Sequence, residues 1–245
     1  MKIKSFIKYL SLGGVFSLLV ACGGGGGGSS ADSPVATPMT PAPVMMSYTV
    51  NVNNLTHNQP LSPLAVVMHS EQLQVWEIGM SASVGLETLA ESGDPASLLA
   101  ELPEADVYSS QPGSGIIAPG MSEEISLTFE EQAAVRFTVL TMMVNTNDAF
   151  AGVQQVDVSG LGVGESMTMN APTYDAGTES NSETIDSIPG PAAGGEGFNA
   201  TRDDVDYISR HPGVVTQADG YVASALDESH RFNDPGLRVT VTRTE

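Results

Sequence analysis

The sequence predicts an all-β fold, an antiparallel β-sandwich with one or two short helices packed at its periphery. Apolar and polar residues alternate with a period of two in several short segments, as in strands with one buried and one exposed face. Turn-forming Gly, Pro, Asn and Asp separate these segments, which favours a sandwich. The part expected to fold, residues 47–245, has about 200 residues, a size that suits one domain.

The strands are expected in two groups. Residues 64–68 and 137–144 are almost continuously apolar, and such strands are usually buried on both faces. We therefore expect them at the centre of the sheets. The alternating segments are expected to be half-buried strands, and they are residues 48–52, 125–129, 167–171 and 237–241.

Two helices are expected between the strands. Ser83 can cap a helix over Val84–Glu91, and Gly93 follows its end. Asp94 can cap a second short helix that opens at Pro95 and carries three leucines on one side. We expect both helices to pack over one end of the sandwich.

Three other features are interpreted as structural. The glycine-rich segment Gly160–Gly164 lies between two predicted strands and is expected to be a hairpin turn. Residues 190–206 are rich in Gly and Asp and are expected to form an exposed loop. The single Trp76 is expected in the core, and His69 is expected to be a hydrogen-bonded residue at the rim of the sandwich.

The N-terminal sequence predicts that the protein is exported and anchored to a membrane by a lipid. Residues 1–21 combine three lysines with a short apolar run and end in Leu-Val-Ala, which is typical of a signal peptide. Cys22 follows directly, and this arrangement resembles the lipobox of bacterial lipoproteins, whose cysteine is acylated. The resemblance implies a bacterial envelope protein anchored in a lipid bilayer through Cys22, with Gly23 favouring the outer membrane. An ordinary signal peptide with an incidental cysteine is the alternative.

Residues 22–46 are expected to be a flexible tether. Six consecutive glycines lead into a segment of small residues interrupted by prolines, and nothing in it can form a core. Because Cys22 is the only cysteine, the folded part has no internal disulfide. The tether favours a domain displayed clear of a membrane.

Charge excludes one class of partner. All three lysines lie in the predicted signal peptide, so the remaining chain has six arginines against 29 acidic residues, a formal charge of −23. Such a chain repels nucleic acid and favours cations and basic partners. Adaptation to a salty habitat is an alternative reason for the acidic composition.

Three carboxylates are candidate metal ligands. Asp148 follows the apolar segment 137–144, and Asp175 and Glu179 flank a tripeptide that contains Gly177. Glycine permits a tight bend that lets both carboxylates face one point. Because no lysine or arginine lies nearby and Ca²⁺ prefers oxygen ligands, the pattern predicts a Ca²⁺ site, with solvated acidic turns as the alternative.

These segments also resemble the spondin domain of F-spondin and mindin, including a bacterial branch of lipoproteins. The resemblance begins near Ser47, reaches the last strand, and is most specific at Tyr174–Glu179, the sequence Tyr-Asp-Ala-Gly-Thr followed by an acid. It is also carried by Tyr48–Thr56, Leu89–Asp94, Thr146–Phe150 and Ile188–Pro191.

The resemblance implies a C2-like β-sandwich that binds Ca²⁺. The family's metal carboxylates correspond here to Asp148, Asp175 and Glu179. Animal members have Asp at the last position, whereas this chain has Glu179. The thrombospondin-type repeats of the animal proteins are absent from this sequence, so their partners do not carry over.

The predicted function is a lipoprotein that displays this domain for adhesion or for recognition of an envelope or matrix component. The ligand, a protein or a glycan, is unknown. No catalytic residue is predicted, because the sequence lacks a Gly-x-Ser-x-Gly elbow and its four histidines lack ligand spacing. Glu183 and Asp186 are interpreted as solvated. A metal-dependent hydrolase or glycan-processing enzyme using the same carboxylates, and a purely structural envelope protein, are the alternatives.

Overall fold

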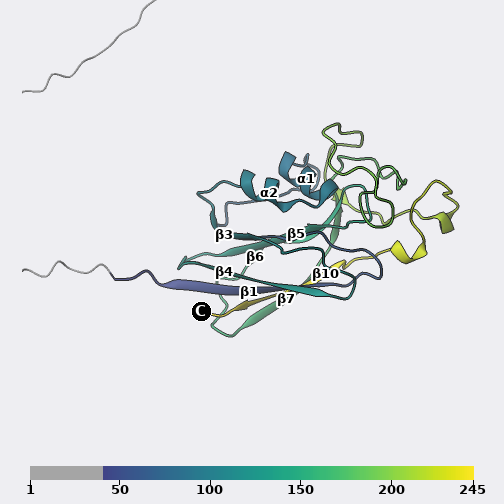
Figure 1. Ribbon diagram of the computed structural model, residues 1–245. Coiled ribbons are helices and arrows are strands. Elements are labelled where there is room, and N and C mark those ends of the chain that lie inside the picture. Colours follow the sequence, from purple (N-terminus) through teal and green to yellow (C-terminus); the bar gives the residue numbers. More distant parts are fainter. Residues whose placement is uncertain (1–40) are drawn as a thin grey trace, which may run out of the picture. The chain divides into compact units, whose positions relative to one another are not determined.

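Two antiparallel sheets form a β-sandwich in the computed structural model, which describes residues 41–245 (Figure 1). The four-stranded sheet has the order β4 (Ser122–Glu130), β1 (Met45–Asn54), β10 (Leu237–Arg243) and β7 (Ser166–Ala171). The six-stranded sheet has the order β3 (Val107–Pro112), β2 (Ala65–His69), β5 (Arg136–Met142), β6 (Ala149–Asp157), β8 (Thr173–Asp175) and β9 (Ser209–Arg210). The predicted all-β fold is confirmed, and residues 42–245 form one compact unit.

The main core lies between the sheets. Along β1 every second residue is buried, and Tyr48, Val50 and Val52 face the other sheet. Phe137 and Val139 of β5 belong to the same apolar cluster. The alternation read from the sequence therefore marks the faces of this sheet correctly.

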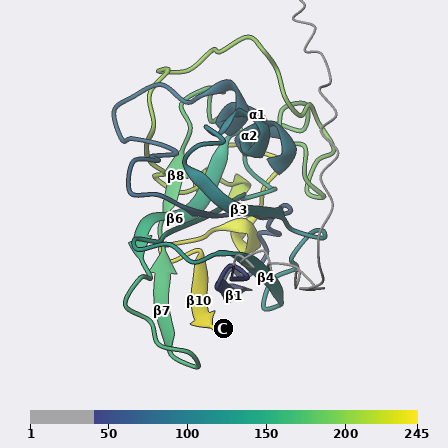
Figure 2. The same cartoon turned by 90° about the vertical axis from the view of Figure 1, so that its left-hand side faces the viewer.

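A second core lies on the outer face of the six-stranded sheet. The helices α1 (Val84–Ser92) and α2 (Pro95–Glu101) cover this face, as Figures 1 and 2 show. Leu86 and Leu89 of α1 cluster there with Leu140 and Phe150 of the sheet. The expectation that the helices pack over one end of the sandwich is therefore wrong. Their position explains why β2 and β5 are apolar on both faces.

The helix boundaries follow the predicted caps. The Ser83 hydroxyl accepts a hydrogen bond from the Leu86 N–H, and Gly93 ends α1 in the left-handed conformation, with φ of +72°. The Asp94 carboxylate accepts a bond from the Ala96 N–H at the start of α2. Two single turns of 3₁₀ helix, η1 (Gln217–Asp219) and η2 (Glu228–His230), complete the described elements.

Several sequence expectations need correction. β1 begins at Met45, inside the predicted tether, and β5 ends at Met142 rather than at residue 144. Gly160–Gly164 connects β6 to β7, which lie in different sheets, so it is not a hairpin turn. His69 is hydrogen-bonded as predicted, to the Ser70 carbonyl and the Thr138 hydroxyl, but it is fully buried rather than at the rim.

Other expectations are confirmed or lie outside the description. Trp76 is buried, and residues 190–206 contain no helix or strand and are exposed or half-buried except for Gly190, which is buried. The predicted signal peptide, Cys22 and the tether up to residue 40 lie outside the described residues. No helix within residues 41–245 has the length and apolar character needed to cross a membrane.

Candidate metal centre

Two of the predicted carboxylates are neighbours at one edge of the six-stranded sheet. Asp148 ends the connection between β5 and β6, and Asp175 is the last residue of β8. Because β6 pairs with β8 so that Ala149 lies opposite Asp175, the two acidic residues meet across adjacent strands. Both side chains are buried, at 0% and 5% exposure. The structure therefore brings Asp148 and Asp175 together.

Asp148 uses only one of its two carboxylate oxygens within the protein. Its Oδ2 accepts hydrogen bonds from the backbone N–H groups of Thr178 and Glu179, at 2.8 and 3.1 Å. Its Oδ1 is buried and has no hydrogen-bond partner within residues 41–245. An unpartnered buried polar atom lowers the stability of the folded state by about 1–3 kcal/mol. A cation bound to Oδ1 would offset this cost.

Asp175 is held by the bend that follows it. Its Oδ1 accepts a bond from the Gly177 N–H at 2.8 Å, and its Oδ2 accepts one from the Asn181 side-chain amide at 2.6 Å. Gly177 has φ of +70°, a left-handed conformation that confirms the predicted bend. The bend fits only glycine, because a Cβ there would lie 2.3 Å from the Tyr207 carbonyl oxygen.

Glu179 is placed differently from the two aspartates. Its backbone N–H contacts Asp148, but its Oε1 accepts a bond from the Asn147 side-chain amide at 2.9 Å. Its Oε2 is buried without a partner among the described residues. Within residues 41–245, no three His, Cys, Asp or Glu side chains are grouped closely enough to hold a metal ion by themselves. The bend thus forms as predicted, but it does not gather all three carboxylates at one point.

The electrostatics of the site favour a proton or a cation. Burial, together with the nearby Asp175 carboxylate, raises the pKa of Asp148 to about 8. Burial also raises the pKa of Glu179 to about 7, with a contribution from the carboxylate of Glu91. Both shifts mean that the local environment opposes an uncompensated negative charge.

The pKa of Asp148 predicts how the metal-free protein responds to pH. Its ordinary value is 3.8, and the folded protein raises it to about 8, so between these values the folded state binds a proton that the unfolded state has released. The free energy of unfolding should therefore fall as pH rises from about 4 to about 8. Urea unfolding in the presence of a chelator, at several pH values, measures this slope.

The matched variant is Asp148→Asn, which keeps the shape but removes the titrating group. Its free energy of unfolding should decline less steeply over the same pH range than that of the wild type. Equal slopes in the two proteins would show that Asp148 does not carry the shifted pKa.

Sequence reasoning missed several residues around these carboxylates. Asn147 and Asn181 donate to Glu179 and Asp175, and both lie within two residues of a predicted ligand. Glu91 of α1 is also buried, and its Oε1 has no partner within the described chain. Its sequence position gives no signal, because only the fold brings α1 to this edge.

Two side chains of α1 hold the long loop near the site. The Glu91 Oε2 accepts a bond from the Asn199 N–H at 2.9 Å. The Glu87 carboxylate pairs with Arg202 at 2.7 Å, and the buried position of Glu87 makes this more than a surface pair. The loop at residues 196–206 is therefore tied to α1 by a backbone hydrogen bond and an ion pair.

The acidic pair further along the chain separates into two environments. Asp186 is exposed, as predicted, but Glu183 is buried, which contradicts the expectation that both are solvated. The Glu183 Oε1 accepts a bond from the Val215 N–H at 2.7 Å. Glu183 therefore connects two loops and is not available as a second carboxylate of a hydrolase pair.

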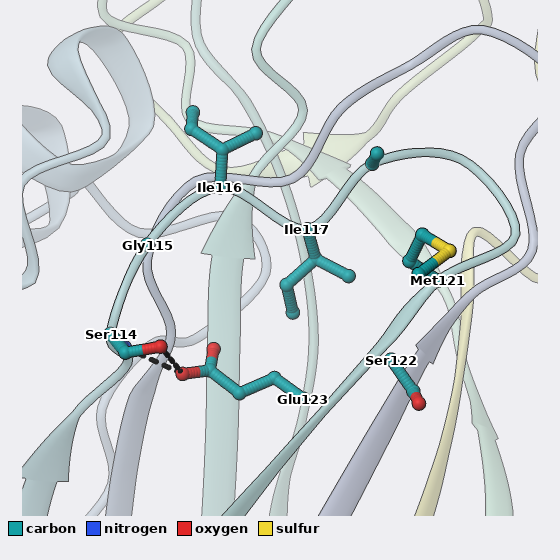
Figure 3. Close-up of a pocket in the computed structure, with 8 residues that line it drawn as sticks. Ser114, Gly115, Ile116, Ile117, Met121, Ser122 and Glu123 are labelled. Carbon is teal, nitrogen blue, oxygen red and sulfur yellow. Dashed lines mark hydrogen bonds between the residues drawn. The ribbon is translucent and has the colours of Figure 1, made fainter.

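Two surface pockets differ in their relation to the site. A pocket of about 220 Å³ is lined by Glu179 and by three other carboxylates, Asp186, Glu196 and Asp203. It adjoins the candidate centre and offers a negatively charged approach. A separate pocket of about 340 Å³ is formed by the connection from β3 to β4 and the first residues of β4 (Figure 3), where Glu123 accepts hydrogen bonds from Ser114. None of the predicted metal ligands lines that second pocket.

The residues at this edge fit a hard cation in their chemistry. Asp148 Oδ1 and Glu179 Oε2 are carboxylate oxygens that are buried and without partners among the described residues. Ca²⁺ is bound by carboxylate and amide or carbonyl oxygens, and such oxygens are concentrated in the loops at residues 145–148 and 175–181.

The fold and this edge define a β-sandwich domain with carboxylate-bearing loops at one margin of its larger sheet. The family model described as Spondin_N matches residues 51–192, which is more than half of the chain and includes all three predicted carboxylates. The chain therefore belongs to the spondin N-terminal domain family, whose domains are in general of the extracellular or surface kind. No curated protein matches the chain.

Proposed function

We propose that this chain is a bacterial lipoprotein that displays a calcium-binding spondin domain for adhesion or for recognition of an envelope or matrix component. The observation that carries the proposal is the buried, unpartnered Oδ1 of Asp148 beside Asp175. A buried carboxylate oxygen without a donor is stabilised by a cation. The membership in the spondin family supports a surface role of the general kind.

Asp148, Asp175 and Glu179 are the proposed ligands, and the Glu179 side chain would have to turn from Asn147 to join the two aspartates at one ion. Bound Ca²⁺ would supply the positive charge that these carboxylates lack. Asp148 already connects the β5–β6 loop to residues 178 and 179 through backbone hydrogen bonds. With an ion beside it Asp148 would stay ionised, and an ionised carboxylate accepts backbone hydrogen bonds more strongly, so the link between the two loops would be strengthened and the surface that they form would be fixed.

The role of the site is proposed to be binding and not catalysis. A catalytic metal keeps an open position for water or substrate. Here the two unpartnered oxygens have almost no surface accessible to water, and Asp148 is fully buried. This burial favours an ion that organises the loops over one that activates a substrate.

Anchoring is proposed from the sequence. Acylated Cys22 would hold the chain in a lipid bilayer, and residues 22–44 would connect the anchor to β1, which begins at Met45. The outer membrane is the proposed location. A strongly acidic domain on such a tether would favour cationic groups on its protein or glycan ligand.

Thermal unfolding of residues 42–245 tests the metal site. A ligand that binds only the folded state at about 100 times its Kd adds about 2.7 kcal/mol of stability, so Ca²⁺ should raise Tm, and Mg²⁺ should raise it less. Asp175→Ala should abolish the rise. Asp186→Ala removes the same charge from an exposed position and should retain it. If Ca²⁺ does not change the Tm of the wild type, the metal site is removed from the proposal.

The same proteins separate adhesion from its rivals. For a binding domain, capture of glycan or protein ligands from a surface panel should depend on Ca²⁺ and be lost in Asp175→Ala. Turnover of glycans or esters by the calcium-loaded wild type would instead favour the hydrolase.

A further inference from the structure

The two sheets end in four edge strands, and three of these edges are protected against pairing with another chain. β4 carries Glu123, Glu124 and Glu130, and β9 is only two residues long. β3 ends in Pro112, and its pairing with β2 contains a register irregularity at Met68 and His69. Charges, proline, irregular pairing and short length are the usual means by which proteins prevent edge-to-edge association.

The fourth edge, β7, has none of these protections. Its sequence, Ser-Met-Thr-Met-Asn-Ala, contains no charge and no proline, and its pairing with β10 has no register shift. Figure 2 shows β7 as the outermost strand of its sheet. Within residues 41–245, β10 supplies all the backbone hydrogen bonds that β7 makes. Its outer edge is thus free to accept another strand.

The sequence of β7 suits pairing with itself. The residues read almost the same in both directions about Thr168, because Met167 and Met169 flank it and Ser166 and Asn170 lie outside them. An antiparallel two-fold contact centred on Thr168 would place threonine opposite threonine and methionine opposite methionine. Cross-strand Thr–Thr and apolar pairs of this kind stabilise antiparallel sheets.

The two faces of β7 would each continue an existing pattern. On the outer face, hydroxyl pairs already join Thr168 to Thr240 at 3.0 Å and Ser166 to Thr242 at 2.8 Å. On the inner face, Met167 lies beside Val241 and remains 37% exposed. A second β7 would extend the hydroxyl rows and cover the exposed methionine.

Charge also favours this strand as the place where two copies meet. The chain has a formal charge of −20, so two copies repel each other over most of their surfaces. β7 is uncharged, and the exposed charged residue of the adjacent strand β10 is Arg238, which lies opposite Asn170 of β7. A contact through β7 brings no carboxylate of this strand against another.

We propose that β7 pairs with β7 of a second copy in a two-fold antiparallel contact and joins two four-stranded sheets into one continuous sheet. A contact made by one short strand buries less than the roughly 1,200 Å² of a stable interface, so the dimer should be weak. Because the two copies repel at long range and salt screens such repulsion, the dimer should strengthen as salt concentration rises.

Sedimentation equilibrium of residues 42–245, which form a compact unit of their own, tests the contact. The wild type should show a monomer–dimer equilibrium that shifts toward dimer in high salt. Thr168→Lys places two like charges opposite each other across the two-fold axis and should weaken the dimer about two- to fivefold, the range that cross-strand pair energies give. Ser126→Lys makes the same charge change on an exposed position of β4 in the same sheet and should dimerise like the wild type.

Cysteine cross-linking locates the contact independently of affinity. The only native cysteine, Cys22, is outside this fragment. Opposed Cα atoms in an antiparallel pair are about 4.5–5.5 Å apart, within disulfide reach, so Thr168→Cys should form a covalent dimer on mild oxidation. Ser126→Cys should not. A wild type that stays monomeric at millimolar concentration in high salt, or equal behaviour of the position 168 and 126 variants, would overturn the proposal.

Discussion

The Phe150→Ala substitution is expected to lower the free energy of unfolding by about 3–5 kcal/mol, the range for removing a large aromatic side chain from a core. Phe150 is fully buried under the helices. Its ring centroid lies 5.4 Å from that of Trp76 and 5.1 Å from that of Tyr174. Urea denaturation of wild type and variant measures the loss.

The same aromatic cluster positions the candidate centre. Phe150 follows Asp148 by two residues, and Tyr174 directly precedes Asp175, so their stacking fixes the two strands that carry the aspartates. Phe150→Leu keeps most of the apolar volume and should cost less than about 1.5 kcal/mol. A loss below about 1 kcal/mol in Phe150→Ala would mean that this second core contributes little to stability.

The Gly177→Ala substitution is expected to lower the free energy of unfolding by more than about 2 kcal/mol. A left-handed backbone conformation, which Gly177 has, by itself costs an alanine about 1–2 kcal/mol. The added Cβ would lie 2.3 Å from the Tyr207 carbonyl oxygen and 2.9 Å from its nitrogen. Tyr207 would have to shift, and the bend that orients Asp175 would open. Thermal unfolding and Ca²⁺ titration of the same variant measure both effects.

Gly220→Ala is the matched control for that substitution. Gly220 has a similar positive φ, +87°, but a Cβ there meets nothing within 4 Å. It should show only the conformational cost and leave Ca²⁺ binding unchanged. Equal losses of stability in the two variants would show that the contact with Tyr207 does not constrain the bend.

The features predicted well from the sequence are those set by local chemistry. Alternation identified the faces of β1 and β10, and capping residues identified both helices, because these signals lie within each element. The predicted position of the helices is wrong, because their packing on β5 and β6 depends on residues distant in the chain. The hairpin predicted at Gly160–Gly164 is absent for the same reason, because which strands pair is decided by residues outside the turn.

The candidate site shows the same division. Asp148 and Asp175 could be placed together from strand ends and turns, and the bend at Gly177 follows from the conformational freedom of glycine. The direction of the Glu179 side chain depends on Asn147 in another loop. Glu183 is buried, and its carboxylate accepts a hydrogen bond from the distant Val215 N–H. Partners supplied by distant segments leave no periodic or local pattern in a single sequence.

Isothermal titration of residues 42–245 with Ca²⁺ tests the central claim most directly. Wild type and Asp186→Asn, which removes an exposed charge beside the site, should each bind one ion per chain. Asp148→Asn should bind none, because it removes the negative charge of the one fully buried carboxylate of the predicted set. Failure of the wild type to bind, or undiminished binding by Asp148→Asn, would contradict the assignment of a calcium site to this edge.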